Sequence, residues 1–340
     1  MKLKVERIVP NLRLHTIING SLVASHGYRI YKSNNNGQTW EYCNRLPAPY
    51  YKKILSRNRL ARRLLRLGIS QMRQIFEDKL LICCDKGMFL SNLPFSCFQR
   101  AEVPVRSFQL LDNSLCVTPE FVYYGEYIPN PKRKEVNIFR TGDGVHWETA
   151  YSFPPKNIKH IHVLQYDPFS KKIWFSTGDA DAECRLGFAN LDFSSPTIIG
   201  KNSQKWRCLE FLFTEDSVYW GMDTPLVQNE LLSYSRKDGR VETIAKFDGP
   251  IYNLRRIGSA GYIIVTGAEG GRGEWDNKAH VWHSTNLHDW EDCISFEKDS
   301  LANLFGYGRL SLTEHMGEQI IIWGSALKEV ENGLLFLAPV

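Results

Sequence analysis

Residues 33–40 read Ser-Asn-Asn-Asn-Gly-Gln-Thr-Trp, and shorter versions of this run occur at 141–147, Thr-Gly-Asp-Gly-Val-His-Trp, and at 284–290, Ser-Thr-Asn-Leu-His-Asp-Trp. Each run follows a short β-like segment and precedes another. The hydroxyl and the Asp or Asn supply oxygens that cap turn amides, glycine accepts a positive φ, and tryptophan packs the turn against a sheet. The runs therefore predict three tight hairpin turns of one repeated sheet unit.

The spacing of the three tryptophans sets the size of this unit. The intervals between Trp40, Trp147 and Trp290 correspond to two and three units of about 50 residues, which is a common length for a four-stranded propeller blade. We predict an all-β, seven-bladed β-propeller, with six blades as the alternative count. The predicted blades cover residues 12–45, 70–103, 105–153, 159–200, 205–249, 250–296 and 304–340.

The last predicted blade has three clear strands, so it needs a fourth. The segment Lys4–Val9 can supply its outer strand and close the ring. Residues 1–340 are then one propeller domain, interrupted by a single helical insertion near 50–68. Within this insertion five arginines alternate with leucines and predict an amphipathic helix over 52–66. We expect its leucines to pack on the propeller and its basic face to be solvated. The alternative is a contact with a protein or an anionic membrane.

The three turn runs resemble the Asp-box of sialidase-like (BNR-repeat) β-propellers. The first run fits the family pattern S-x-D-x-G-x-T-W, with Asn35 at the acidic position. The other two runs are one residue shorter before the tryptophan and lack the threonine. In that family the box is a structural turn, so the resemblance implies the fold and carries no chemistry by itself.

Composition excludes several classes. A chain of 340 residues with 43% hydrophobic and 23% charged residues is an ordinary globular protein rather than a disordered one. Its net charge of +5 is too small, and its basic residues too scattered, to favour nucleic acid. No apolar run reaches the length of a membrane span or a signal peptide. The eight cysteines contain no CxxC pair, so we expect buried thiols and a cytoplasmic location.

Two features predict a ligand site on one face of the propeller. Nearly every predicted inner strand begins with Arg or His, and such a ring of like charges favours an anionic ligand; the alternative is pairing with acidic loops of neighbouring blades. The loops between the second and third strands of blades three to six are long and acidic, and long loops are commonly functional. The expected substrate-binding residues are Arg106, Gln204, Trp206, Arg207, Asp223, Asn229, Arg255, Glu269 and Arg309.

The pair His160 and His162 is the sharpest local signal. Alternation along a strand puts both imidazoles on one side, where they can chelate a divalent metal such as Mn, Ca or Zn. One histidine can instead be a general base, and both can be structural. The residues expected to be catalytic are His160, His162, Tyr124, Glu126, Asp179 and Glu183.

Asp-box propellers are mostly carbohydrate-active, and the His-x-His strand resembles the metal-binding propeller lyases that degrade oligogalacturonate. This resemblance implies an anionic, uronate-type glycan as substrate. In β-elimination, Arg207, Arg255 and Arg309 would hold the carboxylate, while the histidines and Tyr124 transfer protons. Glycoside hydrolysis by a carboxylate pair competes with this interpretation, because the loops offer many acids. The alternative outside enzymology is a glycan- or protein-binding scaffold.

Overall fold

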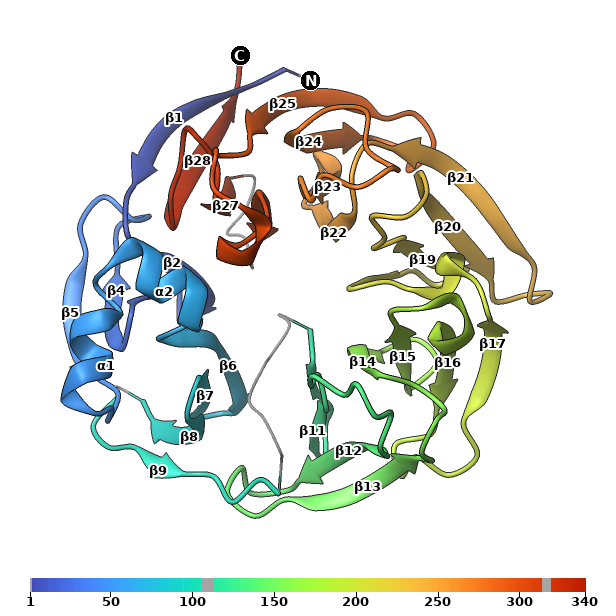
Figure 1. Ribbon diagram of the computed structural model, residues 1–340, viewed down its shortest axis with the longest axis horizontal. Helices are drawn as coiled ribbons and strands as arrows, with labels where there is room; N and C mark the ends of the chain where they lie inside the picture. The colour runs from blue at the N-terminus through green and yellow to red at the C-terminus, as the bar shows by residue number, and fades with distance from the viewer. Residues whose placement is uncertain (1, 94, 105–112, 314–318) are drawn as a thin grey trace. The chain divides into compact units, whose positions relative to one another are not determined.

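The computed structural model describes residues 2–93, 95–104, 113–313 and 319–340. The chain divides into two compact units. The first unit comprises residues 1–100, 255–270 and 276–340, and the second comprises residues 101–254 and 271–275. Figure 1 shows that nearly all regular structure in both units is β-strand.

The first unit contains three complete four-stranded sheets among its described residues. One sheet has the order β2 (Arg13–Ile18), β3 (Ser21–His26), β4 (Arg29–Ser33), β5 (Glu41–Arg45). The next has the order β6 (Ile69–Phe76), β7 (Lys79–Cys84), β8 (Gly87–Asn92), β9 (Gln99–Arg100). The third has the order β1 (Leu3–Val9), β28 (Gly333–Pro339), β27 (Ile320–Ser325), β26 (Arg309–Leu312).

The second unit also contains three sheets, each with its strands in chain order. They are β10 (Leu115–Val117), β11 (Val122–Gly125), β12 (Val136–Thr141), β13 (Glu148–Phe153); β14 (His160–Asp167), β15 (Lys172–Gly178), β16 (Arg185–Ala189), β17 (Thr197–Lys201); and β18 (Phe211–Phe213), β19 (Ser217–Gly221), β20 (Asn229–Ser235), β21 (Val241–Phe247). A seventh sheet, which starts at the boundary of the units, is β22 (Ile251–Ile257), β23 (Gly261–Thr266), β24 (Lys278–Ser284), β25 (Glu291–Glu297).

These seven sheets of four strands confirm the predicted seven-bladed β-propeller, and the six-blade alternative falls. The closure by the N-terminal strand is confirmed too. Strand β1 pairs antiparallel with β28, from Leu3 opposite Pro339 to Val9 opposite Leu334. Buried Leu334 and Phe336 of β28 pack with Leu14 and Leu22 in one hydrophobic cluster, so β1 lies against the blade that completes the chain.

The three turn runs share one hydrogen-bonding pattern. In each, the first hydroxyl accepts a backbone N–H at 2.9 Å, from Gly37, Gly144 and Leu287 respectively. The following Asn35, Asp143 or Asn286 accepts further N–H groups of the same turn at 2.8 or 2.9 Å. Gly37 has a φ of 72° and a Cβ there would lie 2.6 Å from Phe336 Cζ, so the first turn requires glycine.

The insertion is present, but it is two short helices rather than one. Helix α1 (Tyr50–Leu55) and helix α2 (Arg59–Leu65) are separated at Asn58, whose side chain accepts a hydrogen bond from Ala61 N at 2.9 Å. The expected orientation of the leucines is wrong: Leu60, Leu64 and Leu65 are exposed, whereas the side chains of Arg62 and Arg63 turn inward. No described helix is long and apolar enough to cross a membrane.

Candidate functional site

The site is built where strands β14 and β15 meet in the second unit. His160 is the first residue of β14 and lies opposite Gly178, the last residue of β15. This register brings Asp179, the next residue along the chain, beside the histidines. The register shifts between Ile161 and Val163, so His162 is the extra residue of a β-bulge. Bulges of this kind redirect side chains and are frequent next to active sites.

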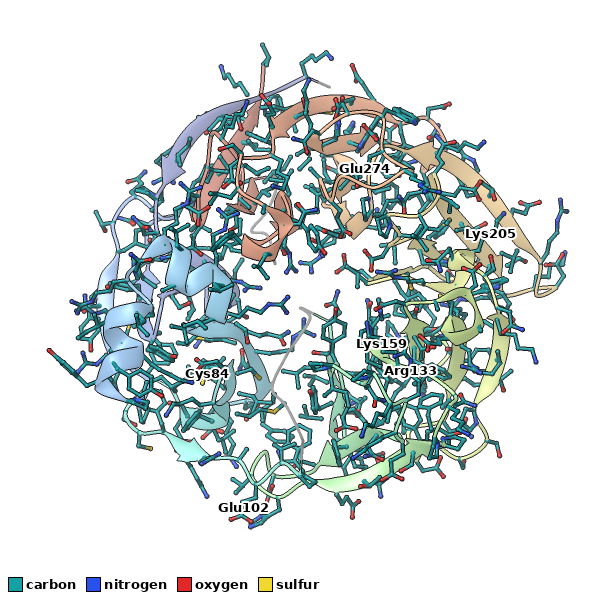
Figure 2. The ribbon with its side chains drawn as sticks, in the orientation of Figure 1. Cys84, Glu102, Arg133, Lys159, Lys205 and Glu274 are labelled. Carbon is teal, nitrogen blue, oxygen red and sulfur yellow. The ribbon has the colours of Figure 1, made fainter. Side chains whose placement is uncertain are left out.

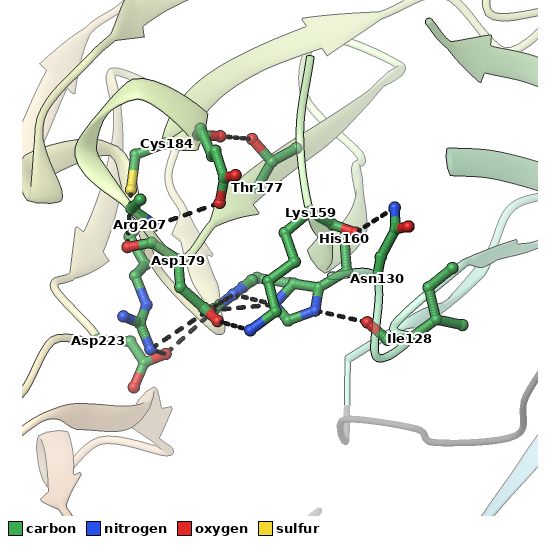
Figure 3. A network of polar contacts seen from close by, with 12 residues as sticks. Ile128, Asn130, Lys159, His160, Thr177, Asp179, Cys184, Arg207 and Asp223 are labelled. Carbon is green, nitrogen blue, oxygen red and sulfur yellow. Dashed lines mark hydrogen bonds and ion pairs between the residues drawn. The ribbon is translucent and has the colours of Figure 1, made fainter. Parts of the chain in front are cut away.

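Three potential ligand atoms converge at this point, and Figure 3 labels two of the residues that supply them, His160 and Asp179. His160 Nε2 and His162 Nε2 lie 3.0 Å apart, and Asp179 Oδ1 lies 3.1 Å from the first and 3.0 Å from the second. Both imidazoles are buried, while the carboxylate of Asp179 remains one-third exposed. When two ligand atoms each lie about 2.1 Å from a metal ion and the angle between the two bonds is 90°, the ligand atoms are about 3.0 Å apart. The triangle therefore has the dimensions of one face of a metal coordination sphere.

The outer nitrogens of both imidazoles face acceptors. His160 Nδ1 donates to the carbonyl oxygen of Ile128 at 3.2 Å, and His162 Nδ1 lies 3.4 Å from Asp223 Oδ2. Burial lowers the pKa of His160 below its usual 6.5, and the neighbouring imidazole of His162 acts in the same direction, so the ring is neutral near pH 7. A neutral ring that donates through Nδ1 presents a lone pair at Nε2, which is the state that binds metals.

The Asp179 carboxylate is ionised. Burial alone would raise its pKa, but the imidazoles that face Oδ1 outweigh burial and hold the pKa well below its usual range. Its other oxygen, Oδ2, accepts from the Lys159 ammonium. Two imidazole nitrogens and a carboxylate oxygen within 3.1 Å of one another need a proton or a cation between them. His160, His162 and Asp179 thus form a group that can hold a metal ion.

Arg207 and Asp223 supply a second charged layer. Arg207 Nη2 lies 3.4 Å from Asp223 Oδ2 and 3.7 Å from Asp179 Oδ1. Burial would raise the pKa of Asp223, but the guanidinium of Arg207 and the hydrogen bond with His162 lower it. Arg207 is the C-terminal cap of the short 3₁₀ helix η2 (Gln204–Trp206) rather than a residue of β18, so the expected position at the start of an inner strand is wrong.

Gln204 fixes the loop that follows Asp179. Its amide nitrogen donates to Asp179 O at 3.0 Å and to Asp181 Oδ1 at 2.6 Å. Its buried Oε1 has no hydrogen-bond partner among the described residues. The loop includes the 3₁₀ helix η1 (Asp181–Glu183), whose Glu183 forms an ion pair with Arg133. Figure 2 labels Lys159 and Arg133, which form ion pairs with Asp179 and Glu183 respectively.

Two residues of the site were not among the expected ones. Lys159 precedes β14 by one residue, and its ammonium group is partly exposed beside Asp179. The ring of Tyr127 lies over that of His160, with centroids 4.1 Å apart, and meets His162 edge-on at 5.8 Å. Tyr127 follows the end of β11 and is only half-buried. The sequence feature that could have identified both residues is their position just outside a strand, because β14 begins at the site and β11 ends there.

Several residues expected at the site instead pack in the core or form hydrogen bonds to the backbone of loops. Tyr124 is fully buried in β11 and stacks on Phe139, which does not support a role as proton donor. Buried Glu126 accepts the Asn137 backbone N–H at 2.8 Å. Asn229 is fully buried and bridges both backbone groups of Thr224, while Trp206 packs on the buried indole of Trp220. These contacts fix the conformation of loops and fill the hydrophobic core.

The remaining expected residues stay predictions. Arg255, Glu269 and Arg309 belong to the first unit, whereas the histidine cluster belongs to the second. The guanidinium of Arg309 lies over the Trp323 ring, 5.9 Å from its centroid. Arg106 lies outside the described residues.

No protein-family model and no sequence of a characterised protein matches the chain. Solved structures with a similar fold include an oligogalacturonate lyase in complex with manganese, with a TM-score of 0.61, 11% identity and coverage of 98% of this chain and 90% of that one. The oligogalacturonate lyase of Vibrio parahaemolyticus has a TM-score of 0.64 and 12% identity, with 98% and 91% covered. A chain in a mitotic checkpoint complex has a TM-score of 0.63 and 10% identity, with 98% and 93% covered.

The extracellular domain of a protein described as a one-component system from B. thetaiotaomicron is also similar, with a TM-score of 0.61 and 11% identity. This chain spans 40% of the length of that domain, which in turn covers 99% of this chain. Identities of 10 to 12% show a shared propeller fold. Because these proteins differ in kind, the fold alone does not select a function.

Proposed function

We propose that the chain is a metal-dependent enzyme that cleaves an anionic, uronate-type oligosaccharide by β-elimination. The observation that carries this proposal is the convergence of His160 Nε2, His162 Nε2 and Asp179 Oδ1 within 3.1 Å. The manganese in a lyase of similar fold supports the same interpretation.

The donor set favours a transition metal over calcium. Two imidazole nitrogens and one carboxylate oxygen suit Mn²⁺ or Zn²⁺, whereas Ca²⁺ prefers oxygen ligands alone. The carbonyl of Ile128 and the carboxylate of Asp223 orient the two rings from behind, as outer-sphere partners of metal-bound histidines usually do. Of the three metals expected from the sequence, Mn²⁺ and Zn²⁺ therefore fit these residues better.

The reaction requires that the C5 proton leaves, the C4–O bond breaks, a C4–C5 double bond forms and the departing oxygen gains a proton. A bound divalent cation would neutralise the uronate carboxylate and so acidify that proton. Arg207 and Lys159 lie beside Asp179 and can bind the same carboxylate from the protein side. Tyr127, half-buried over His160, would take up the C5 proton as a phenolate and return it to the departing oxygen, which replaces the proton-donor role that the sequence suggested for Tyr124.

Glycoside hydrolysis is less well supported by the charge states. A hydrolase needs one carboxylic acid that stays protonated near neutral pH, which requires a raised pKa. The pKa values of Asp179 and Asp223 are both lowered, so neither carboxyl can serve as that acid. Glu183 is held in an ion pair by Arg133. β-Elimination uses carboxylates only as ionised groups and is compatible with these states.

The first test is the metal content of untagged protein purified without chelators. Elemental mass spectrometry should give about one transition-metal ion per chain, and the double variant His160→Ala/His162→Ala should lose it. His283→Ala is the matched control, because His283 is buried like the pair and its Nε2 donates to the Ala260 carbonyl oxygen in the first unit. A metal-free protein that also fails to bind added Mn²⁺ or Zn²⁺ contradicts the proposal.

The second test is product formation from a panel of uronate oligosaccharides. Unsaturated products, detected by absorbance and mass spectrometry, should accumulate with wild-type protein and not with the double variant. Saturated products would replace the lyase with a hydrolase. Saccharide binding without any product, with metal bound, would favour the non-catalytic glycan-binding alternative.

A further inference from the structure

The helical insertion exposes an unusual number of large apolar side chains. Six of them lie on α1 and α2 and two lie on the adjoining segment around the 3₁₀ helix η3 (Asn303–Phe305), and each is between 44 and 79% exposed. They are Tyr50, Tyr51, Ile54, Leu60, Leu64, Leu65, Leu304 and Tyr307. Arg63 Nε donates to the Phe305 carbonyl, which holds η3 against α2. We refer to these eight side chains, with Lys53 and Arg57, as the insertion surface.

Ion pairs on the inner side of the insertion determine this exposure. The side chain of Arg63 is 6% exposed and binds Asp299 at 2.6 Å and Glu331 at 3.3 Å. Lys52 binds Asp85 at 2.5 Å on the α1 side. The side chains of Arg62 and Arg63 meet these carboxylates, whereas Leu60, Leu64 and Leu65 of the same helix are exposed.

The insertion carries more positive charge than its partners neutralise. Residues 50–66 contain two lysines, five arginines and no acidic residue. The carboxylates of Asp85, Asp299 and Glu331 form ion pairs with Lys52, Arg59, Arg62 and Arg63. Lys53 and Arg57 form no ion pair or side-chain hydrogen bond with any described residue. The insertion surface is therefore both apolar and positively charged.

A cavity at the edge of the insertion is lined by side chains of both charges. It has a volume of about 390 Å³, lies between the insertion and the segments 8–11 and 329–331, and is lined by Arg57, Arg59 and Arg62. Glu329 and Glu331 also line it, and Glu331 is engaged by Arg59 and Arg62.

We propose that the insertion surface docks on an anionic lipid bilayer. Exposed Tyr, Ile and Leu beside basic residues are what an interfacial segment presents to the headgroup and acyl boundary. A nucleic acid would match the charge but would leave the apolar side chains in water. A second copy of the chain would match the apolar side chains but would oppose positive charge with positive charge. This inference is independent of the metal site.

The experiment is co-sedimentation of the full chain with vesicles of phosphatidylcholine alone and of phosphatidylcholine with phosphatidylglycerol. Wild-type protein should sediment with the second kind only, and high salt should release it. Lys53→Glu/Arg57→Glu should weaken the partition coefficient at least about thirtyfold, since each basic residue near an anionic surface contributes about fivefold. Leu64→Ser/Leu65→Ser should weaken it about tenfold or more, because less apolar surface leaves water.

Matched control variants distinguish the effect of a change in the insertion surface from the effect of the same change elsewhere on the protein. Lys237→Glu/Lys246→Glu changes the net charge equally at exposed positions of the second unit, and Leu226→Ser/Val227→Ser removes equally exposed apolar side chains there. Both controls should bind like wild-type protein. The proposal is overturned if wild-type protein ignores anionic vesicles, or if Lys53→Glu/Arg57→Glu binds like its control. It is also overturned if Leu64→Ser/Leu65→Ser abolishes self-association instead of vesicle binding, which would assign the surface to a second copy.

Discussion

His162 Nδ1 lies 3.4 Å from Asp223 Oδ2, while Nε2 of the same ring lies 3.0 Å from Asp179 Oδ1. The buried ring is thus held between two carboxylates, one behind it and one beside it. Arg207 neutralises the carboxylate behind, so Asp223 remains ionised although it is buried. Asp223 Oδ2 is thus the acceptor that faces His162 Nδ1, and a proton on that nitrogen would leave Nε2 to bind a metal.

Asp223→Asn should therefore weaken metal binding without removing a ligand. The amide cannot orient the ring as the carboxylate does, and losses of an outer-sphere partner of this kind lower metal affinity by about 10- to 100-fold. Competition with a fluorescent chelator measures the change. Asp238→Asn makes the same chemical change on an exposed turn and should leave the affinity unaltered. Equal affinities of Asp223→Asn and wild-type protein would remove Asp223 from the metal site.

Tyr127→Phe should abolish turnover while the metal stays bound. If the phenol of Tyr127 transfers the proton, its removal lowers turnover by about 100-fold or more. Tyr124→Phe is the matched control, because Tyr124 lies three residues away and is fully buried in β11. Product formation and metal content are measured on both variants. Wild-type turnover in Tyr127→Phe would assign proton transfer to another group, with Lys159 the next candidate by position.

Acid should weaken the attachment of the helical insertion. Burial would raise the pKa of Asp299, but the hydrogen bond from Arg63 outweighs it and lowers the pKa below 3.8. A lowered pKa contributes stability that is present above the unfolded value of 3.8 and is lost as the pH falls through the folded value. Asp299→Asn should cost about 2 kcal/mol at pH 7 and progressively less in that acidic window.

Denaturant unfolding over a pH series measures this effect. Glu297→Gln is the control, since the ion pair of Glu297 with Lys328 is half-exposed on both sides and should contribute less than about 1 kcal/mol at any pH. A pH-independent cost of Asp299→Asn would mean that packing, and not charge, anchors the insertion.

The propeller was predictable because its signals are local. Each turn is specified by a hydroxyl, an Asp or Asn and a tryptophan within eight residues, and alternating strands flank it. The outward leucines of α2 were not predictable. Arg63 turns inward because of Asp299 and Glu331, which lie more than 230 residues away along the chain, and helical periodicity carries no information about such partners.

The candidate site shows the same division. His160 and His162 stand out because both lie within one short segment, and Asp179 was expected from its acidic loop. Their convergence depends on the β14–β15 register and on a bulge at His162, neither of which the pattern reveals. Tyr124 and Tyr127 look alike in sequence. Only the end of β11 at Gly125 places the first in the core and leaves the second half-buried beside His160.

The far end of β14 offers a test that separates stability from metal binding. Asp167 is fully buried and binds Arg236 through two nitrogens, at 2.6 and 3.0 Å. Asp167→Asn would leave a partly buried guanidinium without its charge partner, which costs about 3 kcal/mol. His160 begins the strand that Asp167 ends, so about 20 Å separates them and metal affinity should not change. The control is Glu242→Gln, which removes the partner of exposed Arg240 and should lower the free energy of unfolding by less than about 1 kcal/mol. Denaturant midpoints and chelator competition on both variants check the prediction, and a loss of metal affinity in Asp167→Asn would show that the strand transmits strain to the histidines.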